Sequence, residues 1–424
     1  MGKTTVKAGK KPKQVFVRKD TLAFCPLMVQ SDTGYEMHIY HNAEDIDDVA
    51  WDALNHTGNI FTSLNYLRGL QFTAPPEMSF FYVILRNGRK NIAGYIFQSI
   101  HLTVEVLQDV LEPLTRQKSI VAHMSEWLSY CREQKGMRVL ISGNNFVSGE
   151  HGVLTPKGTN SALAFSLLPE VVKTIVQKVS KPVKFSLILV KDYYASHNQK
   201  PEVLLTKKRY HAFAVEPEMI LKIDPQWSDF SEYMSAMSKK YRNRTKSVLK
   251  SSGPLKEHHL NEDDLRTVLN DIYPLYMKMH QKARFRLAAL TPHYFVEMKR
   301  RFPAQFGVRM YTLNGKAVGF RTFFVNGDQL EAHFIGVDYQ INKELDIYNR
   351  ILYDFVDDAI KTGRKELLLG RTAAEIKSTI GAVPHDLNCY IRHRNSFSNQ
   401  IIRPFIDYLK PSEWTPRNHF KNEG

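Results

Sequence analysis

Two polar side chains lie two residues apart in QLEAHFIGVD, a segment whose other residues predict a β-strand. They are Glu331 and His333. Because side chains alternate between the two faces of a strand, both should point the same way. Either could accept a proton as a general base, and a neighbouring carboxylate would keep the imidazole oriented and basic. The alternative is a strand whose polar face is simply exposed to solvent.

Further along the chain, several residues could bind an anionic ligand. Asp346 can cap a helix predicted over 345–362, and the amides of a first helical turn attract anions. A Gly-Arg-Thr step follows the next predicted strand, where the Arg371 guanidinium could clamp a phosphate or carboxylate. A surface ion pair from Arg371 to Glu375 or Glu366 is the alternative. The residues predicted to bind the anion are Lys343, Asp346, Asn349, Arg350, Arg371 and Lys377.

The sequence does not favour chemistry at a metal centre. Its three cysteines, Cys25, Cys131 and Cys389, are too far apart for a disulfide framework or a cysteine zinc site, which favours a reducing compartment. The histidines show no HExxH pattern, and the pair His258–His259 has no obvious third ligand. We therefore expect no metal ligands and no tightly bound cofactor.

The formal net charge of +15 predicts an anionic partner. A basic segment at the N-terminus, 1–34, contributes part of it, and SKKYRNRTKSVLK contributes another part. On a helix, four cations of the second cluster would form one stripe, namely Lys239, Arg242, Lys246 and Lys250. An anionic acyl carrier, a tRNA or an anionic membrane surface could meet this stripe. No DNA-binding motif accompanies the charge, so DNA is not an expected partner.

The hydropathy pattern bears on location. No apolar run reaches the length of about eighteen residues that a membrane-spanning helix needs. The basic N-terminus is not followed by an apolar run, so we do not expect a secretory signal. The expected location is the cytoplasm, with peripheral association at the inner face of the membrane as an extension of this prediction.

The predicted elements occur twice in the same order. FFYVILRNGRKNIAGYIF and GVRMYTLNGKAVGFRTFF each contain a strand, an Asn-Gly turn and a second strand with a glycine, which is a strong hairpin pattern. Helical segments precede each hairpin, and further strands and helices follow it. A repeat of this length predicts two copies of one fold, unless the hairpins merely share their turns. The predicted divisions are a flexible tail over 1–34, a first domain over 35–216, a helical basic join over 217–260 and a second domain over 261–424.

From about Trp227 to Arg394 the sequence resembles the FemABX-like branch of the GNAT superfamily, the double-domain acyltransferases. The residues that carry this resemblance are SKKYRNRTK, EAHFIGVDY, a helix with an early tyrosine, a strand that ends in glycine, and GRTAAEIKSTIGA. The resemblance is weaker over 35–216. It implies an α/β (α+β) fold with two GNAT-like mixed-sheet domains in tandem, joined by a helical segment.

The resemblance also implies the chemistry, which is transfer of an acyl or aminoacyl group from an activated carrier to an amine. A lipid or a cell-envelope precursor would supply that amine. In GNAT-like sheets the fourth and fifth strands splay around the acyl thioester, which would place Glu331 and His333 near the reacting atoms and Tyr348 near the leaving group. The second domain is expected to hold the donor, and the first to support it.

One departure from the GNAT pattern concerns the donor. GNAT enzymes bind the coenzyme A pyrophosphate with a glycine-containing Q/R-x-x-G-x-G/A loop, whereas DYQINKELDIYN contains no glycine. Acyl-CoA, an acyl carrier protein and an aminoacyl-tRNA are therefore alternative co-substrates. The alternative functions are a tRNA-dependent aminoacyltransferase of the Fem type and a catalytically inactive GNAT-like binding protein.

Overall fold

The computed structural model describes residues 26–105, 107, 136–159, 161–179, 185–196, 199–282, 287–402, 406, 414–417 and 419–420. Most of the predicted N-terminal tail, and with it Cys25, lies outside these ranges, as does Cys131. Within 1–34, Leu27–Gln30 form the edge strand β1. In the described part of the chain, no helix combines the length and apolar character needed to cross a membrane.

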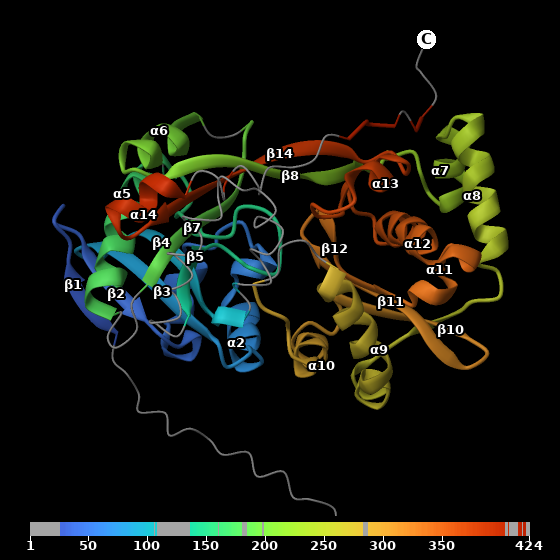
Figure 1. Ribbon diagram of the computed structural model, residues 1–424, viewed down its shortest axis with the longest axis horizontal. Coiled ribbons are helices and arrows are strands. Elements are labelled where there is room, and N and C mark those ends of the chain that lie inside the picture. Colours follow the sequence, from blue (N-terminus) through green and yellow to red (C-terminus); the bar gives the residue numbers. More distant parts are fainter. Residues whose placement is uncertain are drawn as a thin grey trace, which may run out of the picture.

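One continuous mixed β-sheet runs through both halves of the molecule (Figure 1). Its strands lie in the order β1-β2-β3-β4-β5-β7-β14-β8-β13-β12-β11-β10-β9, with β6 paired to β4. After β1, the strands of the first half are β2 (Glu36–Tyr40), β3 (Met78–Asn87), β4 (Lys90–Leu102), β5 (Met137–Ser142), β6 (Val153–Leu154) and β7 (Phe185–Tyr194). The strands that follow in sequence are β8 (His211–Lys222), β9 (Lys256–His259), β10 (Phe306–Leu313), β11 (Lys316–Asn326), β12 (Gln329–Val337), β13 (Glu366–Leu368) and β14 (Val383–His393).

Helices cover both faces of this sheet. Those of the first half are η1 (Ala43–Asp45), α1 (Asp48–Asp52), η2 (Ile60–Thr62), α2 (Leu64–Phe72), α5 (Ser161–Thr174), η4 (Ile175–Val179) and α6 (Gln199–Lys207). Those that follow are α7 (Phe230–Ala236), α8 (Lys239–Ser251), α9 (Glu262–Lys282), α10 (Pro292–Arg301), α11 (Tyr339–Leu345), α12 (Ile347–Lys361), α13 (Ala374–Ser378) and α14 (Ser396–Ile401). The mixed sheet with helices on both faces agrees with the predicted α/β (α+β) fold class.

Both predicted hairpins are present, and the second has the predicted Asn-Gly turn, whereas the two loop residues of the first are Gly88 and Arg89. The last pair before the turn is Asn87 with Lys90 in β3 and β4, and Leu313 with Lys316 in β10 and β11. In the second turn, Asn314 and Gly315 both have positive φ angles, which is the backbone that a two-residue turn between twisted strands requires. The Asn-Gly dipeptide therefore sets the register of this hairpin locally.

The two halves are joined through shared strands. Strand β14 belongs to the second half in sequence but lies between β7 and β8, where it pairs antiparallel with both. Strand β8 in turn pairs with β13 of the second half. Figure 1 shows β8 and β14 as long strands that cross from one half to the other. Strand β8 also spans the predicted division at 216, and 217–260 contain the end of β8 and strand β9 as well as α7 and α8.

The hydrophobic core has a part common to both halves. On one face of the sheet, side chains from α2 and η2 of the first half meet those from α9, α10 and β11 of the second, and the rings of Phe61 and Phe324 lie 5.2 Å apart. Helices α2 and α10 approach closely at Gly69, where an added Cβ would lie 2.7 Å from the side chains of Met298 and Arg301. On the other face, each half has its own core, against α7, α8 and α12 in the second half and α5 in the first.

Candidate active site

Strands β12 and β13 part shortly after they begin to pair. They are parallel, and their pairing comprises Gln329↔Glu366, Leu330↔Leu367 and Glu331↔Leu368. Strand β12 then continues to Val337, whereas β13 ends at Leu368. Glu331 therefore stands at the last paired position, where the two strands fork.

Glu331 is a buried carboxyl group. Its side chain is on the face of the sheet that bears the common core, and its Oε1 accepts a hydrogen bond of 3.2 Å from Asn326 Nδ2. Burial and, to a smaller extent, the charge of Glu218 raise the pKa of Glu331 to about 8, although the hydrogen bond from Asn326 acts in the other direction. A carboxyl group with this pKa can exchange a proton near neutral pH, as a general base must.

His333 lies on the same face but in different surroundings. The pairing of β11 with β12 passes from Thr322↔Phe334 to Phe323↔Ala332, so His333 is the extra residue of a β-bulge. Its ring packs among aromatic rings, and its nitrogens lie 3.3 Å from Tyr294 Oη and 3.4 Å from Thr322 Oγ1. Burial lowers the pKa of His333 to about 3, which makes it a weak base. Its polar contacts are thus with Tyr294 and Thr322 and not with Glu331.

A second buried carboxyl group lies near Glu331. Glu218 on β8 is 1% exposed, and its Oε2 accepts a hydrogen bond from the Tyr194 hydroxyl of β7. Burial raises the pKa of Glu218, and burial followed by the charge of Glu218 raises that of Tyr194. Because two carboxyl groups that interact titrate as a pair, Glu218 favours the protonated form of Glu331 and is part of the same site.

An ionic cluster adjoins this pair. Asp192 on β7 is completely buried, with Lys191 Nζ at 2.5 Å and the Arg371 guanidinium at 2.8 Å. Burial opposes ionisation of Asp192, but Arg371 and Lys191 outweigh it and keep its pKa below the ordinary value. Lys191 also donates to the carbonyls of Asn144 (2.6 Å) and Val147 (2.9 Å), so the cluster anchors the loop that follows β5.

Lys377 is also buried and engaged. Its ammonium donates to the carbonyls of Leu369 at 2.6 Å and Gly370 at 3.2 Å, just after β13. Burial lowers the pKa of Lys377 to about 8, although the charges of Glu216 and Glu218 act in the other direction. Lys377 therefore fixes the segment after β13, whereas Arg371 links that segment to Asp192 of β7.

The remaining predicted anion-binding residues lie at the junction of α11 and α12. Asp346 connects the two helices with a left-handed backbone, φ 49°, and its carboxylate lies 3.4 Å from Asn349 Nδ2. One amide of the first turn of α12 is already occupied, because Tyr348 N donates to Asn342 Oδ1 at 2.9 Å. The Tyr348 side chain packs against the core of the second half, and burial raises its pKa to about 12. Lys343 is exposed.

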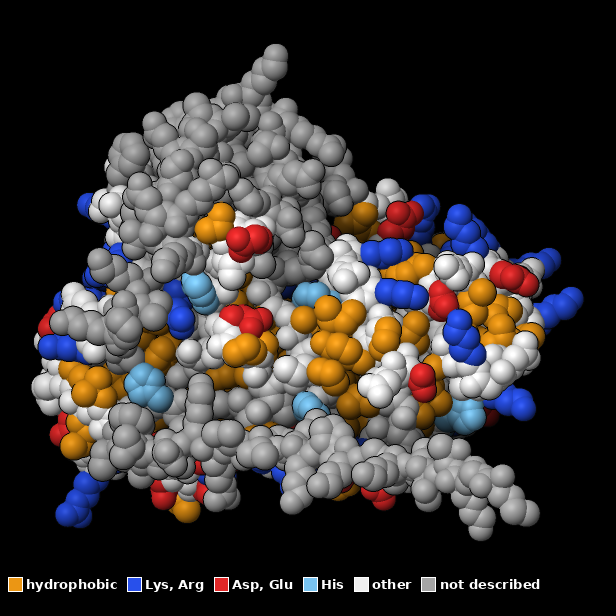
Figure 2. Space-filling model, turned by 60° about the horizontal axis from the view of Figure 1, so that its bottom comes forward, with side chains coloured by type: hydrophobic (Ala, Val, Ile, Leu, Met, Phe, Trp, Pro, Cys, Tyr) orange, Lys and Arg blue, Asp and Glu red, His pale blue; other side chains and the backbone are white. Residues whose placement is uncertain are grey.

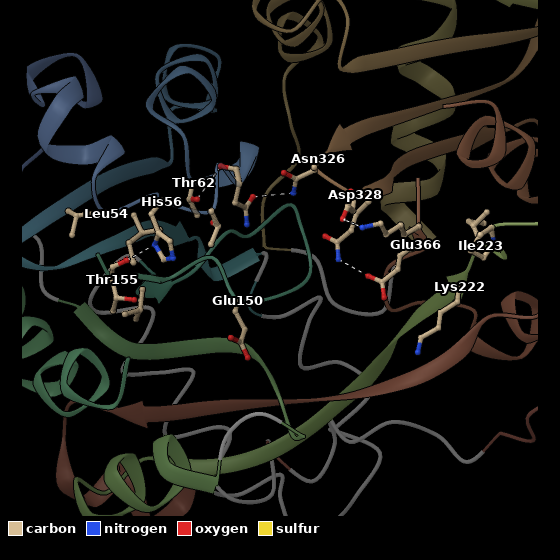
Figure 3. Close-up of a pocket in the computed structure, with 18 residues that line it drawn as sticks. Leu54, His56, Thr62, Glu150, Thr155, Lys222, Ile223, Asn326, Asp328 and Glu366 are labelled. Carbon is tan, nitrogen blue, oxygen red and sulfur yellow. Dashed lines mark hydrogen bonds and ion pairs between the residues drawn. The ribbon is translucent and has the colours of Figure 1, made fainter. Parts of the chain in front are cut away.

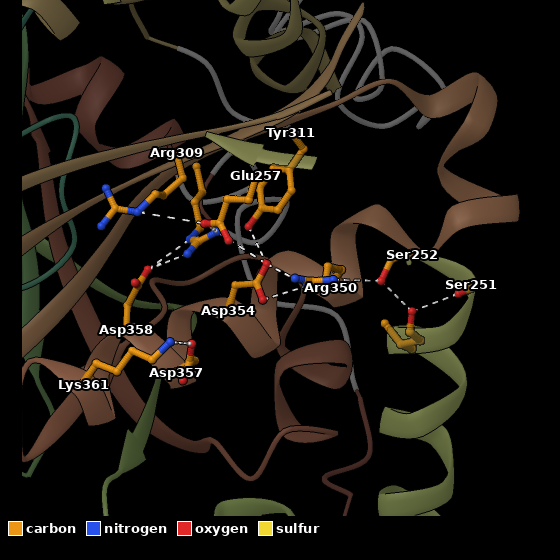
Figure 4. A network of polar contacts seen from close by, with 12 residues as sticks. Ser251, Ser252, Glu257, Arg309, Tyr311, Arg350, Asp354, Asp357, Asp358 and Lys361 are labelled. Atoms are coloured by element: carbon orange, nitrogen blue, oxygen red, sulfur yellow. Dashed lines mark hydrogen bonds and ion pairs between the residues drawn. The ribbon is translucent and has the colours of Figure 1, made fainter. Parts of the chain in front are cut away.

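A buried ionic network fixes this junction to the sheet (Figure 4). Arg321 of β11, 2% exposed, lies 2.7 Å from Asp358 and 2.8 Å from Glu257. Asp354 of α12 accepts hydrogen bonds from Tyr311 at 2.6 Å and from Arg350 at 2.8 Å. Burial raises the pKa of Asp354 to about 6. Arg350 also lies 3.4 Å from Ser252 Oγ, so its guanidinium joins α12 to the end of α8.

The predicted site residues thus occupy separate places. Glu331 and His333 face the first half, whereas Lys343, Asp346, Tyr348, Asn349 and Arg350 surround the start of α12. Arg371 belongs to the ionic cluster, and Lys377 binds carbonyls of the segment after β13. Within the ranges that the structure describes, no three His, Cys, Asp or Glu side chains converge as metal ligands do.

The sequence did not predict the residues that strands β7 and β8 contribute to this site. Glu218, Tyr194 and Asp192 are far from Glu331 in sequence and reach it only through the order of the strands. A signal was nevertheless present in KFSLILVKDYY, where Lys191 and Asp192 interrupt a strand that is otherwise apolar. Charged residues are rarely buried unless they are paired, so such an interruption indicates a partner elsewhere in the fold.

A cleft lies between the halves (Figure 3). Its volume is about 860 Å³. The wall from the first half includes His56, Asn59 and Glu150, and that from the second includes Lys222, Asn326 and Glu366. Asn326 Nδ2 lies 3.2 Å from Asn59 Oδ1 as well as from Glu331, so it joins the cleft to the buried carboxyl group.

Comparison with known proteins shows a likeness of fold. No protein-family model and no curated protein sequence matches the chain. The crystal structure of FemX matches with a TM-score of 0.51 at 9% identity, over 86% of this chain and 99% of that chain. A tandem GNAT protein from the clavulanic acid biosynthesis pathway matches with a TM-score of 0.46 at 7% identity, over 85% and 99% of the two chains. L-PGS from Bacillus licheniformis matches with a TM-score of 0.45 at 11% identity, over 86% and 96%.

The FemX match extends along nearly all of both chains, and at 9% identity it concerns the fold alone. The repeated hairpins and the forked strands agree with it. The chain has the FemABX-like, double-domain GNAT-type fold that its sequence resembles.

Proposed function

We propose that this protein is an acyltransferase that moves an acyl or aminoacyl group from an activated carrier to an amine. The observation that carries the proposal is the position of Glu331, a buried carboxyl group at the fork of two parallel strands in a GNAT-type sheet. Transfer to an amine needs the reactants held in position and one proton removed from the attacking ammonium. Glu331 is the group that we assign to this proton.

The reaction requires few protein groups. The Glu331 carboxylate takes a proton from the ammonium, the freed amine attacks the carbonyl carbon of the donor, and a C–N bond forms. The bond from that carbon to the sulfur or oxygen of the carrier breaks, and the leaving atom takes a proton. We assign Tyr348 as the donor of this proton. The nitrogen loses its second proton to solvent, the Tyr348 phenolate takes up a proton from solvent, and Glu331 releases its own proton to solvent, so that one proton is released overall. Glu218 and Tyr194 position Glu331 and tune its pKa.

We assign the junction of α11 and α12 to the anionic part of the carrier. Lys343, Asn349 and Arg350 supply hydrogen-bond donors there. The backbone amide of Tyr348 already donates to Asn342, so it is not available to a pyrophosphate. This arrangement keeps acyl-CoA, an acyl carrier protein and aminoacyl-tRNA as alternative donors. The net charge of +15 and the cations of α8 favour a second candidate, a tRNA-dependent aminoacyltransferase of the Fem type. A protein at the surface of an anionic membrane would use the same cations.

Native mass spectrometry of the purified protein, followed by transfer assays with acetyl-CoA and alanyl-tRNA, tests the proposal. A retained acyl-CoA or tRNA identifies the carrier. Glu331→Gln should lower turnover roughly a hundredfold, the scale on which a general base contributes. Glu36→Gln is the matched control, because Glu36 is exposed on β2. If no donor is retained or consumed, a binding protein without catalysis replaces the proposal.

A further inference from the structure

Among the described residues, the one hydrogen-bond donor to the Glu331 carboxyl group is Asn326. This asparagine is the last residue of β11 and is 8% exposed. Glu331 pairs with Phe324, two residues earlier in β11, so Asn326 and Glu331 lie on the same face of the sheet. The bond from Asn326 Nδ2 reaches Oε1 at 3.2 Å. Within the described chain Oε2 has no donor, so it is the oxygen left to take a proton.

The orientation of the Asn326 amide is fixed by the first half of the chain (Figure 3). Its Oδ1 accepts a hydrogen bond of 3.0 Å from the backbone N–H of Ile60, the first residue of η2. A backbone N–H can only donate, so the amide oxygen faces η2 and the amide nitrogen faces Glu331. The same nitrogen lies 3.2 Å from Asn59 Oδ1. Asn326 can therefore only donate to Glu331, and a donor favours the carboxylate form.

Asn59 is held in its turn. Its Oδ1 also accepts a hydrogen bond of 3.0 Å from Phe61 N–H, as the cap of η2. Its Nδ2 lies 3.4 Å from His151 Nδ1, and His151 Nε2 lies 2.8 Å from the carbonyl oxygen of Ser148. Because a carbonyl only accepts, Nε2 carries the hydrogen of this imidazole and Nδ1 is the acceptor. The chain of donors that starts at Asn326 thus ends in the loop that follows β5.

Other titratable groups bear on Glu331 from several elements. They are Glu218 of β8, Tyr194 of β7, Tyr66 of α2 and His333 of its own strand. Burial raises the pKa of both phenols and lowers that of the imidazole, so all three side chains are neutral near pH 8. Glu218 and Asn326 therefore act on the charge of Glu331 in opposite directions.

We propose that Asn326 is a positioning residue for Glu331, and that the first half of the chain holds it in this role through Ile60 and Asn59. Asn326 stabilises the carboxylate and occupies Oε1, so that Oε2 is the oxygen presented to the proton. The first half thereby contributes to catalysis without touching the reacting atoms. The role of Glu331 as a base rests on the proposed function, whereas the effect of Asn326 on the Glu331 carboxyl group does not.

Carbon-detected NMR of the full-length protein, labelled with ¹³C-glutamate, tests the proposal without any acyl donor. Glu331→Gln identifies the Glu331 signal, and a titration from pH 6 to 10 gives its midpoint. Asn326→Leu removes the donor with little change in volume. It should raise the midpoint by about one pH unit or more, because a hydrogen bond to the charged form is lost.

Gln329→Leu is the matched control. Gln329 pairs with Asn326 across the same hairpin, but its amide donates to Glu366. The same change of an amide to leucine should therefore leave the Glu331 midpoint within about 0.3 pH units of the wild type. Thermal melts of each variant check that the fold is retained.

Asn326→Asp is the second variant, in case the leucine variant does not fold. It keeps the acceptor for Ile60 N–H and so preserves the link to η2. A second carboxyl group beside Glu331 must raise the pH at which the pair loses its last proton. In transfer assays, kcat/KM of Asn326→Leu at pH 7 should fall about tenfold and recover above the new midpoint, which a merely structural loss would not do.

A Glu331 midpoint that neither Asn326 variant moves in the folded protein overturns the positioning role. Equal shifts in Asn326→Leu and Gln329→Leu also overturn it, since the effect would then come from the hairpin as a whole. Transfer that depends on Glu331, with a pH dependence that Asn326→Leu leaves in place, overturns the role and leaves the proposed function intact. A shifted midpoint without transfer from any donor supports the role and removes the proposed function.

Discussion

The pKa of Glu331 depends on the burial of its side chain. In water its carboxylate would hold no proton at neutral pH and would be a weak base. Burial, with Glu218 nearby, raises its pKa to about 8. Alternation along QLEAHFIGVD predicted the direction of Glu331 and His333, because that pattern is local. It could not predict the β-bulge at His333, which depends on the partner strand, or the aromatic rings around the imidazole.

The pKa of Glu331 predicts a pH dependence. As the proposed base, Glu331 must be deprotonated, so kcat/KM should rise with pH and reach half its plateau near pH 8. The effect on stability has the opposite sign. The folded state holds a proton that the unfolded carboxyl has already lost above its ordinary pKa, so this contribution to stability is lost as pH rises through about 8. Initial rates and urea unfolding, each from pH 6 to 9.5, measure both effects.

In Glu331→Gln the side chain cannot titrate. Its residual activity should lack the rising limb, and its free energy of unfolding should fall less between pH 7 and 9.5 than that of the wild type. An unchanged rising limb in the variant would assign the limb to another group, such as the Glu218–Tyr194 pair.

Asp192 is a buried carboxylate whose ion pairs contribute to stability. Asp192→Asn leaves Lys191 and Arg371 without their common counter-charge, and loss of one partner in a buried pair costs about 3–5 kcal/mol. Because its folded pKa lies below the unfolded value, this stabilisation is present above the ordinary carboxyl pKa and is lost as pH falls through the folded one. Urea unfolding at pH 7 measures the loss. Asp357→Asn, which breaks a surface pair with Lys361, should cost less than about 0.5 kcal/mol.

Helix α8 is the element whose pattern the sequence predicted most directly. Tyr241, Thr245 and Val248 are buried against the second half. The predicted stripe lies on the other side, with Lys239, Lys246 and Lys250 exposed and Arg242 half-buried. Within the described chain, none of these four cations forms an ion pair with a carboxylate. Figure 2, on its one face, shows Lys and Arg side chains gathered towards the edge of the second half. The helix predicted over 345–362 is α12, which begins at Ile347, and the short helix α11 precedes it in the segment without glycine.

Reversal of two charges tests whether this stripe meets an anionic partner. Lys246→Glu with Lys250→Glu should weaken tRNA binding at least about tenfold and lower the slope of log affinity against log salt by roughly 1.5 or more. If anionic vesicles are the partner, their binding should fall instead, since each cation contributes about 1 kcal/mol near lipid. Fluorescence anisotropy and vesicle sedimentation at low salt measure the two cases.

The same change in net charge on another helix is the control. Lys207→Glu with Lys208→Glu reverses two exposed cations at the end of α6 and its following turn. If both double variants weaken binding equally, the attraction comes from overall charge. If neither changes binding or donor affinity, the stripe of α8 is a solvated helix face.

At the scale of the whole molecule, local patterns predicted the two copies of the fold but not their connection. The Asn-Gly hairpins each form within about twenty residues, so their repetition was visible in the sequence. The insertion of β14 between β7 and β8 depends on pairing between residues nearly 200 positions apart, such as Leu387 with Tyr194. The carboxyl pair and the cleft between the halves follow from this insertion, which explains why neither could be predicted.

The shared strands predict that the first half depends on the end of the chain. A chain that stops at residue 382 lacks β14, so β7 loses its hydrogen-bonding neighbour on that side, and the core loses Cys389 and Ile391. An exposed strand edge beside a depleted core should lower the stability of the first half and promote aggregation. A chain that stops at residue 402 keeps β14 and is the control. Hydrogen exchange, read at the amides of β7, should show protection lost by at least about tenfold in the shorter chain alone. Full protection of β7 in the shorter chain would mean that the first half folds without its borrowed strand and that the carboxyl pair is assembled later, when the halves meet.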